Sequence, residues 1–189
     1  MRLPVETERL VLRSFEPGDL DGLAELHGDE DLVRWIPWAA RDREEAAAVL
    51  ERKVGQTAFT EPGGGVAVAA VRRDDGDFVG DLVLMYSSEV NSLAEIGFML
   101  GRRHHGQGYA TEGCRELLRM AYEELGMHRV IGRLESRNLA SARVLERLGM
   151  RREAELIENE WIKGEWQSEV TYAMLEREWR ERASMAPQA

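Results

Sequence analysis

The chain is poor in cysteine, in long apolar segments and in basic side chains, and each shortage excludes a class of protein. Cys114 is the only cysteine among the 189 residues, so an intrachain disulfide or a cysteine-rich metal site cannot form. No apolar run approaches the length of a membrane-spanning helix. Charged and apolar residues alternate over Met1–Phe15, unlike in a signal peptide. We therefore expect a cytoplasmic protein without a membrane partner.

The charge balance of the chain is acidic. Asp and Glu number 35 against 25 Lys and Arg, which gives a formal net charge of −10. A chain of this charge repels phosphate backbones, which argues against nucleic acid as a partner and favours a cationic amine as a substrate. Hydrophobic residues make up 43% of the chain, enough for one packed core.

The spacing of apolar residues predicts a mixed α+β chain. Alternation predicts strands, and apolar residues at helical spacing predict helices. Turns at Asp75-Gly76 and Lys163-Gly164 predict two antiparallel hairpins. The predicted strands cover residues 8–15, 66–72, 78–86, 93–100, 129–135, 150–162 and 165–174. The predicted helices cover residues 20–28, 43–56, 139–148 and 175–182, with one more between the loop 101–108 and Gly126.

A glycine-rich basic loop, Gly101–Gly108, leads directly into one of these helices. The first N–H groups of a helix have no intrahelical partner and, with the helix dipole, favour an anion. Gly106 and Gly108 let the backbone approach that anion because they lack a Cβ. Basic side chains precede them, namely Arg102, Arg103, His104 and His105. A phosphate-bearing ligand is the simplest interpretation, and a solvated loop whose glycines only make a turn is the alternative.

The residues missing from this loop narrow the choice of phosphate ligand. Gln107-Gly108 stands where a nucleoside-triphosphate loop needs a lysine and a hydroxyl residue. A dinucleotide fingerprint would need a third glycine where Thr111 stands, and Glu135, the possible ribose-binding acid, lies further downstream than usual. A dinucleotide-dependent oxidoreductase therefore stays only as an alternative function.

Two segments carry a resemblance to a known family. Arg103-x-x-Gly106-x-Gly108 runs directly into Tyr109-Ala110-Thr111-Glu112, and this is similar to the acyl-CoA pyrophosphate loop of the GCN5-related N-acetyltransferases, the GNAT superfamily. Further along, Asn138-x-x-Ser141 opens the predicted helix 139–148. This segment resembles one in the ribosomal-protein N-terminal (alanine) acetyltransferase-like branch of that superfamily.

The resemblance covers essentially the whole chain, because Thr7–Arg13 and Lys163–Trp166 also look like that branch. It implies the α+β GNAT fold, with a central mixed, mostly antiparallel sheet that is flanked by helices. The fourth and fifth strands of this sheet splay apart and leave a cleft. Residues 1–182 would form a single acetyltransferase domain, and residues 183–189 a frayed tail.

The resemblance also implies acetyl-coenzyme A as the co-substrate, without a metal. Backbone groups of Phe98, Met99 and Leu100 would hold the pantetheine arm, and Asn138 would bond it from the other side. Arg143 could reach the adenosine phosphate, although a solvated helix charge is an equal alternative. The residues implied to wrap the pyrophosphate are Arg103, His104, His105, Gly106, Gln107, Gly108, Tyr109, Ala110 and Thr111.

Acyl transfer to an amine requires a base, because a simple alkylammonium is largely protonated at neutral pH. Glu95, near the start of the strand 93–100, is the first candidate, and Glu135 or a water relay is the next. The departing thiolate needs a proton or hydrogen-bond donor. Ser141 resembles the residue near the sulfur in relatives, although it could be an ordinary helix serine. Cys114 falls on the buried face of its helix, so we expect direct transfer without an acyl-enzyme.

Aromatic residues in two irregular segments are candidates for an acceptor pocket. Trp35 and Trp38 flank Ile36-Pro37, and Trp161 lies in the last hairpin, although each could equally seal an edge of the core. The predicted function is transfer of an acetyl group to a primary amine, such as a protein N-terminus or a small molecule. A succinyl or longer donor, a homodimer, and a non-catalytic CoA-binding or sensing module stay open.

Overall fold

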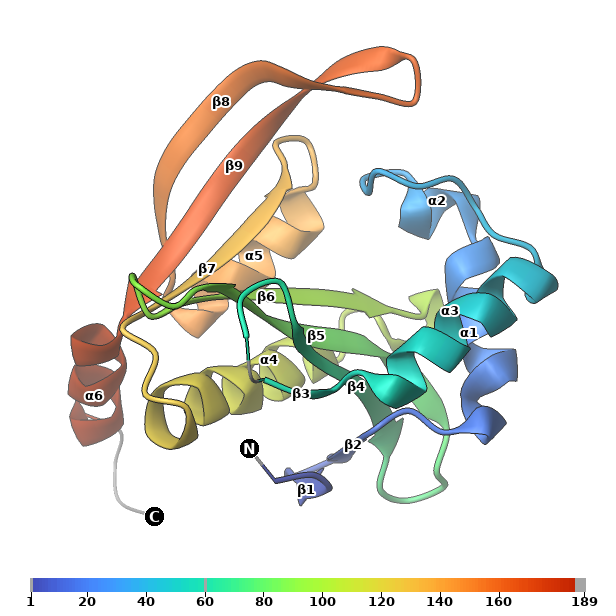
Figure 1. Ribbon diagram of the computed structural model, residues 1–189, viewed down its shortest axis with the longest axis horizontal. Helices are drawn as coiled ribbons and strands as arrows, with labels where there is room; N and C mark the ends of the chain where they lie inside the picture. The colour runs from blue at the N-terminus through green and yellow to red at the C-terminus, as the bar shows by residue number, and fades with distance from the viewer. Residues whose placement is uncertain (1, 60, 186–189) are drawn as a thin grey trace.

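A single twisted sheet organises the molecule, and helices cover both of its faces (Figure 1). The computed structural model describes residues 2–59 and 61–185. The strands follow the order β1-β2-β4-β5-β6-β7-β9-β8, with β3 beside β4. Their bounds are β1 Val5–Glu6, β2 Leu10–Arg13, β3 Thr57–Ala58, β4 Gly65–Arg72, β5 Phe78–Ser88, β6 Leu93–Leu100, β7 Arg129–Glu135, β8 Arg151–Ile162 and β9 Glu165–Leu175.

The junction of β6 and β7 is the one parallel pairing among the described strands. It consists of three residue pairs, Leu93 with Arg129, Ala94 with Val130, and Glu95 with Ile131. Beyond Glu95 the two strands diverge, and Figure 1 shows β7 rising away from β6. The expected mixed sheet with a splayed central pair is therefore confirmed, and β6 and β7 are the strands that splay.

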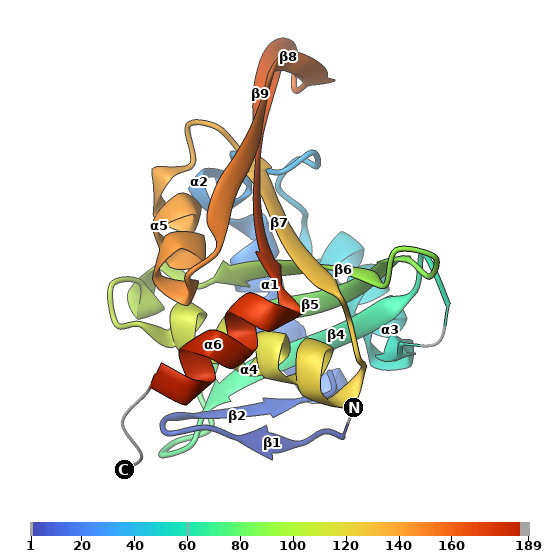
Figure 2. The same ribbon diagram turned by 90° about the vertical axis from the view of Figure 1, so that its left-hand side faces the viewer.

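Helices pack on the two faces of the sheet in two groups. On one face α1 and α3 bury Leu23, Leu26, Val49 and Leu50 against Ala67 and Ala69 of β4. On the other face α4 and α5 bury the larger part of the core, and α6 lies beside α4 (Figure 2). The helix bounds are α1 Leu20–Gly28, α2 Glu30–Val33, α3 Arg43–Gly55, α4 Tyr109–Arg119 with a π-helical turn Met120–Glu124, α5 Leu139–Leu148 and α6 Glu176–Met185.

The sequence pattern located these elements well, with a few differences. A short helix, α2, forms because the Asp29 side chain accepts hydrogen bonds from the N–H groups of Asp31 and Leu32. The C-terminal helix continues past Arg182 to Met185, so residues 183–185 extend the helix and do not begin a frayed tail. Residues 186–189 of the expected tail lie outside the described residues. No described helix is long and apolar enough to cross a membrane.

One carboxylate ties the N-terminal strands to the start of α4. Glu112 accepts hydrogen bonds from the Thr7 hydroxyl at 2.6 Å, from the Arg9 backbone N–H at 2.7 Å and from Arg9 Nε at 2.8 Å. Burial opposes ionisation of Glu112, but these bonds outweigh it and lower its pKa. The same Arg9 donates from Nη1 to the Gln107 carbonyl oxygen at 2.8 Å. The N-terminal segment thereby fixes the loop that precedes α4.

The packing of α4 gives a test of the core. Leu117 is fully buried on this helix, whereas Leu139 at the start of α5 is 60% exposed. Leu117→Ala should lower the free energy of unfolding by about 2–5 kcal/mol because it removes buried methyl groups and leaves a cavity. Leu139→Ala should change it by about 0.5 kcal/mol or less. Urea unfolding followed by circular dichroism measures both, and equal losses would contradict the packing of α4 described above.

Candidate active site

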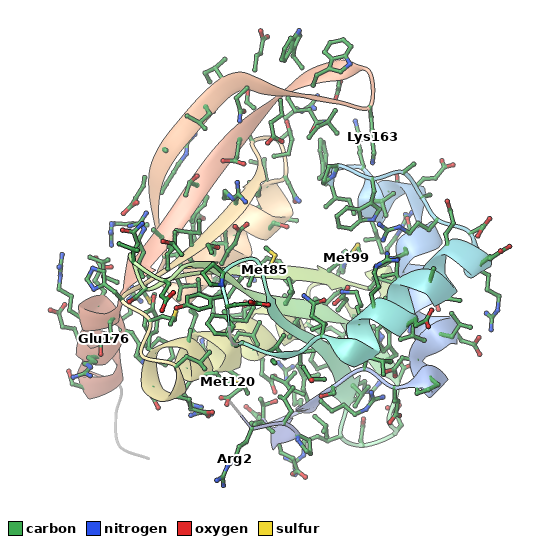
Figure 3. All side chains as sticks on the ribbon, in the orientation of Figure 1. Arg2, Met85, Met99, Met120, Lys163 and Glu176 are labelled. Atoms are coloured by element: carbon green, nitrogen blue, oxygen red, sulfur yellow. The ribbon has the colours of Figure 1, made fainter. Side chains whose placement is uncertain are left out.

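The divergence of β6 from β7 opens a cleft of about 590 Å³. Its walls come from the separated ends of these strands, the start of α5, the segment 35–41 with α3, and the hairpin of β8 and β9. Figure 3 shows Met85 and Met99 low in this region and Lys163 high above them. Lys163 Nζ donates a hydrogen bond to the Val33 carbonyl oxygen at 2.6 Å. The tip of the hairpin thereby bridges the mouth of the cleft to α2.

The loop before α4 presents a run of unpaired backbone donors. The N–H groups of the six residues 106–111 have no hydrogen-bond acceptor among residues 2–59 and 61–185. The first amide after them that is paired belongs to Glu112, which donates to Gly108 O at 3.0 Å. Gly106 and Gly108 adopt positive φ values of 72° and 86°, which glycine accepts without strain. Consecutive free amides at a helix N-terminus form an anion site.

The arginines of the loop are turned to acidic partners elsewhere. Arg102 bonds both carboxylate oxygens of Asp29 at 2.6 Å. Arg103 donates to Glu25 and Asp77, each at 2.9 Å, and the hydrogen bond to Asp77 is the largest cause of the raised pKa of Arg103. The acidic partners are not evident from the sequence, which predicts only that these cationic side chains lie beside the amides. In this structure they anchor the loop, and the amides supply its positive field.

The histidines and the glutamine of the loop also bond within it. His104 is 4% exposed, and burial lowers its pKa, so at neutral pH it is predominantly uncharged. His105 Nε2 lies 2.9 Å from the Leu100 carbonyl oxygen, and Gln107 Nε2 donates to the Arg103 carbonyl oxygen at 2.8 Å. These contacts hold the loop in the shape that leaves its amides free.

The turn between β7 and α5 brings Asn138 and Ser141 to the cleft. Asn138 Oδ1 accepts a hydrogen bond from the Ser141 backbone N–H at 3.1 Å and so caps α5. The Ser141 hydroxyl makes no hydrogen bond within the described part of the chain. Glu135 also lines the cleft, but its carboxylate accepts from Arg137 N at 2.8 Å and from Arg137 Nε at 2.7 Å. Glu135 thus holds the turn, whereas the Ser141 hydroxyl is available.

Glu95 lies where the strands begin to separate, and it is 8% exposed. Arg133 of β7 bonds its carboxylate at 2.9 to 3.2 Å, and this bond is the largest cause of the raised pKa of Arg133. Alternation along β6 puts Glu95 on the face of Met99, which packs with α1 and α3. Because α5 covers the other face, Glu95 and Ser141 reach the cleft from opposite sides of the sheet.

Sequence reasoning missed a second carboxylate in this cluster, Glu169 of β9. Burial raises the pKa of Glu169, Arg133 opposes the rise, and the Glu160 and Glu95 carboxylates add to it. Arg133 Nη1 lies 3.6 Å from Glu169 Oε2. Glu169 shares a face with Arg133, because β7 pairs Arg133 with Thr171 of β9 and side chains two residues apart along a strand lie on the same face. No local sequence signal reports this long-range register.

The tryptophans divide between the cleft and the surface. Trp35 and Trp38 line the cleft, and Trp35 lies between Arg34 at 4.6 Å and Arg137 at 5.3 Å from its ring centroid. Trp161 does not line the cleft, because it is 61% exposed on the hairpin and packs edge-on against Trp166 at 5.4 Å.

The remaining residues expected at the site lie in different surroundings. Phe98 and Met99 line the cleft, whereas Leu100 is buried behind it. Arg143 is exposed on α5 and does not line the cleft. Cys114 is fully buried away from the cleft, and burial raises the pKa of its thiol. Its thiolate is therefore not accessible as a nucleophile.

Comparisons with known proteins agree with this geometry. Residues 9–151 match the family model described as the acetyltransferase (GNAT) domain. The uncharacterized N-acetyltransferase YnaD of Bacillus subtilis is 30% identical over 175 residues, which cover 93% of this chain and 98% of that protein. YdaF of the same organism, provisionally named a ribosomal N-acetyltransferase, is 30% identical over 176 residues, which cover 91% of this chain and 94% of that protein.

The fold is also similar to that of solved GNAT-family acetyltransferases. An acetyltransferase of the GNAT family from Bacillus anthracis superposes with a TM-score of 0.83 at 26% identity, over 92% of this chain and 98% of that chain. The family model spans most of the chain, and the relatives match it nearly end to end. The chain therefore belongs to the GNAT family, and it is an acetyltransferase enzyme whose family uses acetyl-CoA.

Proposed function

We propose that the protein transfers the acetyl group of acetyl-CoA to a primary amine by direct attack. The amine nitrogen bonds to the thioester carbonyl carbon, the bond from this carbon to sulfur breaks, and the amine gives up a proton. The observation that carries the proposal is the run of free amides at residues 106–111 beside a cleft between two splayed strands. The amides would bind the pyrophosphate, and the cleft would hold the arm that ends in the thioester.

The half of β6 that is not paired with β7 supports the assignment of the pantetheine site. Its backbone from residue 96 to residue 100 has no partner in β7, and unpaired backbone groups in a cleft need other partners. The amide-containing pantetheine arm would supply them at Phe98 and Met99, with the Asn138 amide group on the opposite wall. We keep Arg143 as a weaker proposal for the adenosine phosphate, because it lies on the exposed side of α5.

The ammonium proton would leave toward the carboxylates beside the splay. Glu95 is the first candidate for the base, directly or through a water molecule, and Arg133 orients its carboxylate. Glu169 on the same side has a raised pKa, which suits a group that accepts a proton near neutral pH. Glu135 is the weaker candidate because Arg137 occupies its carboxylate.

The Ser141 hydroxyl would serve the leaving thiolate from the other side of the sheet. It lines the cleft, and its backbone, not its hydroxyl, takes part in the helix cap. A hydroxyl in this place can donate a hydrogen bond or a proton to the sulfur as negative charge develops there. Cys114 has no access to the cleft, which supports transfer without an acyl-enzyme.

The cofactor assignment can be tested with two matched glycine substitutions at the ends of α4. Gly106 and Gly126 have φ values of 72° and 66°, and an added Cβ at either would meet no atom within 4 Å. Gly106→Trp should abolish calorimetric binding of acetyl-CoA because the indole fills the anion site, whereas Gly126→Trp should retain it. Binding of NADH but not of CoA by the wild type would contradict the proposal and favour the dinucleotide alternative.

Two substitutions test the chemistry once an acceptor amine is found by screening for CoA release. Glu95→Gln should lower kcat by about 10²–10⁴-fold, and Ser141→Ala by on the order of 10²-fold, with acetyl-CoA binding retained. Exposed Glu155→Gln on β8 is the control. If acetyl-CoA binds but no amine in a broad panel releases CoA, the protein would instead be a CoA-binding or sensing module.

The pH dependence tests the part played by Glu169. A base acts in its deprotonated form, so a raised pKa moves the acid limb of kcat/KM to higher pH than an ordinary glutamate would give. We expect Glu169→Gln to shift that limb to lower pH, since it removes the buried carboxylate whose pKa is raised. A limb that stays at the wild-type position in this variant would mean that the proton does not pass through Glu169.

A further inference from the structure

Two arginines on the cleft wall that is formed by the segment 35–41 and α3 form no ion pair with an acidic side chain of the described residues. Arg41, in the segment leading into α3, and Arg52, on α3, both line the cleft. Neither forms an ion pair with any carboxylate of the described chain, whereas Arg43 on the same helix pairs with Asp21 at 2.6 Å. Burial and the charge of Arg52 lower the pKa of Arg41. The Glu45 and Asp81 carboxylates partly oppose this effect, but neither arginine has a carboxylate of the described residues in direct contact.

Rings, and not carboxylates, hold Arg41 in place. Its Nη1 lies 2.9 Å from His27 Nδ1. Because a guanidinium can only donate, Nδ1 accepts and the ring proton is on Nε2. The guanidinium also lies 4.7 Å from the Trp38 ring centroid. These contacts fix the direction of Arg41 and leave its remaining N–H groups for another acceptor.

The nearest carboxylates are already used. Asp81 bonds Lys53 Nζ through both oxygens, at 3.0 and 2.8 Å. Glu45 completes the cap of α3 by accepting from the Asp42 backbone N–H at 3.0 Å. Burial disfavours the charge of Arg41, so an anion between Arg41 and the exposed Arg52 would stabilise this wall.

Buried polar atoms without a hydrogen-bond partner among the described residues lie on both walls of the cleft. The Trp38 indole N–H is buried and has no partner, and it adds a third donor side chain to the wall with Arg41 and Arg52. The opposite wall offers hydrogen-bond acceptors. Gln167 is 4% exposed and its Oε1 has no partner, and Glu160 and Glu169 lie on the same hairpin. The cleft thus has a donor wall and an acceptor wall.

We propose that Arg41 and Arg52, with the Trp38 indole, form a carboxylate subsite, and that the acceptor is a small amine that also carries a carboxylate, as an amino acid does. The inference rests on the proposed acetyl transfer and adds the class of its substrate. The planar fork of arginine matches a carboxylate in two hydrogen bonds. The CoA phosphates are not the proposed occupant, because the free amides of residues 106–111 lie at the N-terminus of α4, which packs on the opposite face of the sheet from α3.

The test compares each amine with its own carboxamide. The panel holds glycine, β-alanine, 4-aminobutyrate and lysine, each as the free acid and as the amide, with saturating acetyl-CoA. For at least one pair, the wild type should prefer the acid by about tenfold or more in kcat/KM, as a charge-assisted contact provides. Arg41→Gln and Arg52→Gln should each reduce this preference, and Arg43→Gln, on the same helix but outside the cleft, should keep it.

Equal rates for acid and amide in the wild type, or a preference that survives both cleft substitutions, would overturn the subsite. Arg52→Gln removes a more exposed side chain, so it keeps the test valid if Arg41→Gln does not fold. Arg41→Lys should retain part of the preference because it keeps the charge without the fork.

A second measurement is independent of turnover. The Trp38 indole N–H signal in a ¹⁵N-labelled sample is assigned by its loss in Trp38→Phe. 4-Aminobutyrate should shift this signal saturably in the wild type and not in Arg41→Gln, and the amide of 4-aminobutyrate should not shift it. If no amine is acetylated but this shift occurs, the subsite stands and the acetyl-transfer proposal fails. No shift with any acid of the panel would overturn the subsite.

Discussion

The early end of the pairing between β6 and β7 is the constraint on which the site depends. Three residue pairs join these strands, and the rest of their facing edges would be satisfied in an ordinary sheet. The turn after β7 keeps them apart, because Glu135 fixes Arg137 and Asn138 starts α5 directly beneath. The helix packs so closely that a Cβ on Gly132 would lie 2.9 Å from the Leu145 side chain. Backbone and helix together hold the cleft open.

The proposed anion site before α4 depends on backbone groups more than on charged side chains. In a chain of net charge −10, the arginines of the loop find acidic partners, so they steady the loop and contribute little free positive charge. The backbone amides of residues 106–111 need no partner to keep their polarity, and it does not change with pH. Arg9 and Glu112 brace this loop from the N-terminal strands. Segments that lie far apart in the sequence, the N-terminal strands and the loop before α4, thus form one connected structure.

Local patterns predicted the elements and much of the site, whereas long-range register did not follow from them. Alternation and helical spacing located the hairpins and helices, and Glu95, Asn138 and Ser141 do meet in one cleft. The partners of Arg103 come from α1 and from the start of β5, and the sequence gives no sign of such pairs. Glu169 enters the cluster through the register of β9 with β7, and Trp161 turns outward with the hairpin.

We propose that free backbone groups, more than charged side chains, bind the acetyl donor. Amide hydrogen exchange, measured by NMR with and without acetyl-CoA, tests it most directly because it reports each N–H group separately. We expect slower exchange at residues 106–111 and in the part of β6 that has no partner in β7 when acetyl-CoA is present, with little change in β1 and β2. Unchanged exchange at residues 106–111 under saturating acetyl-CoA would contradict it.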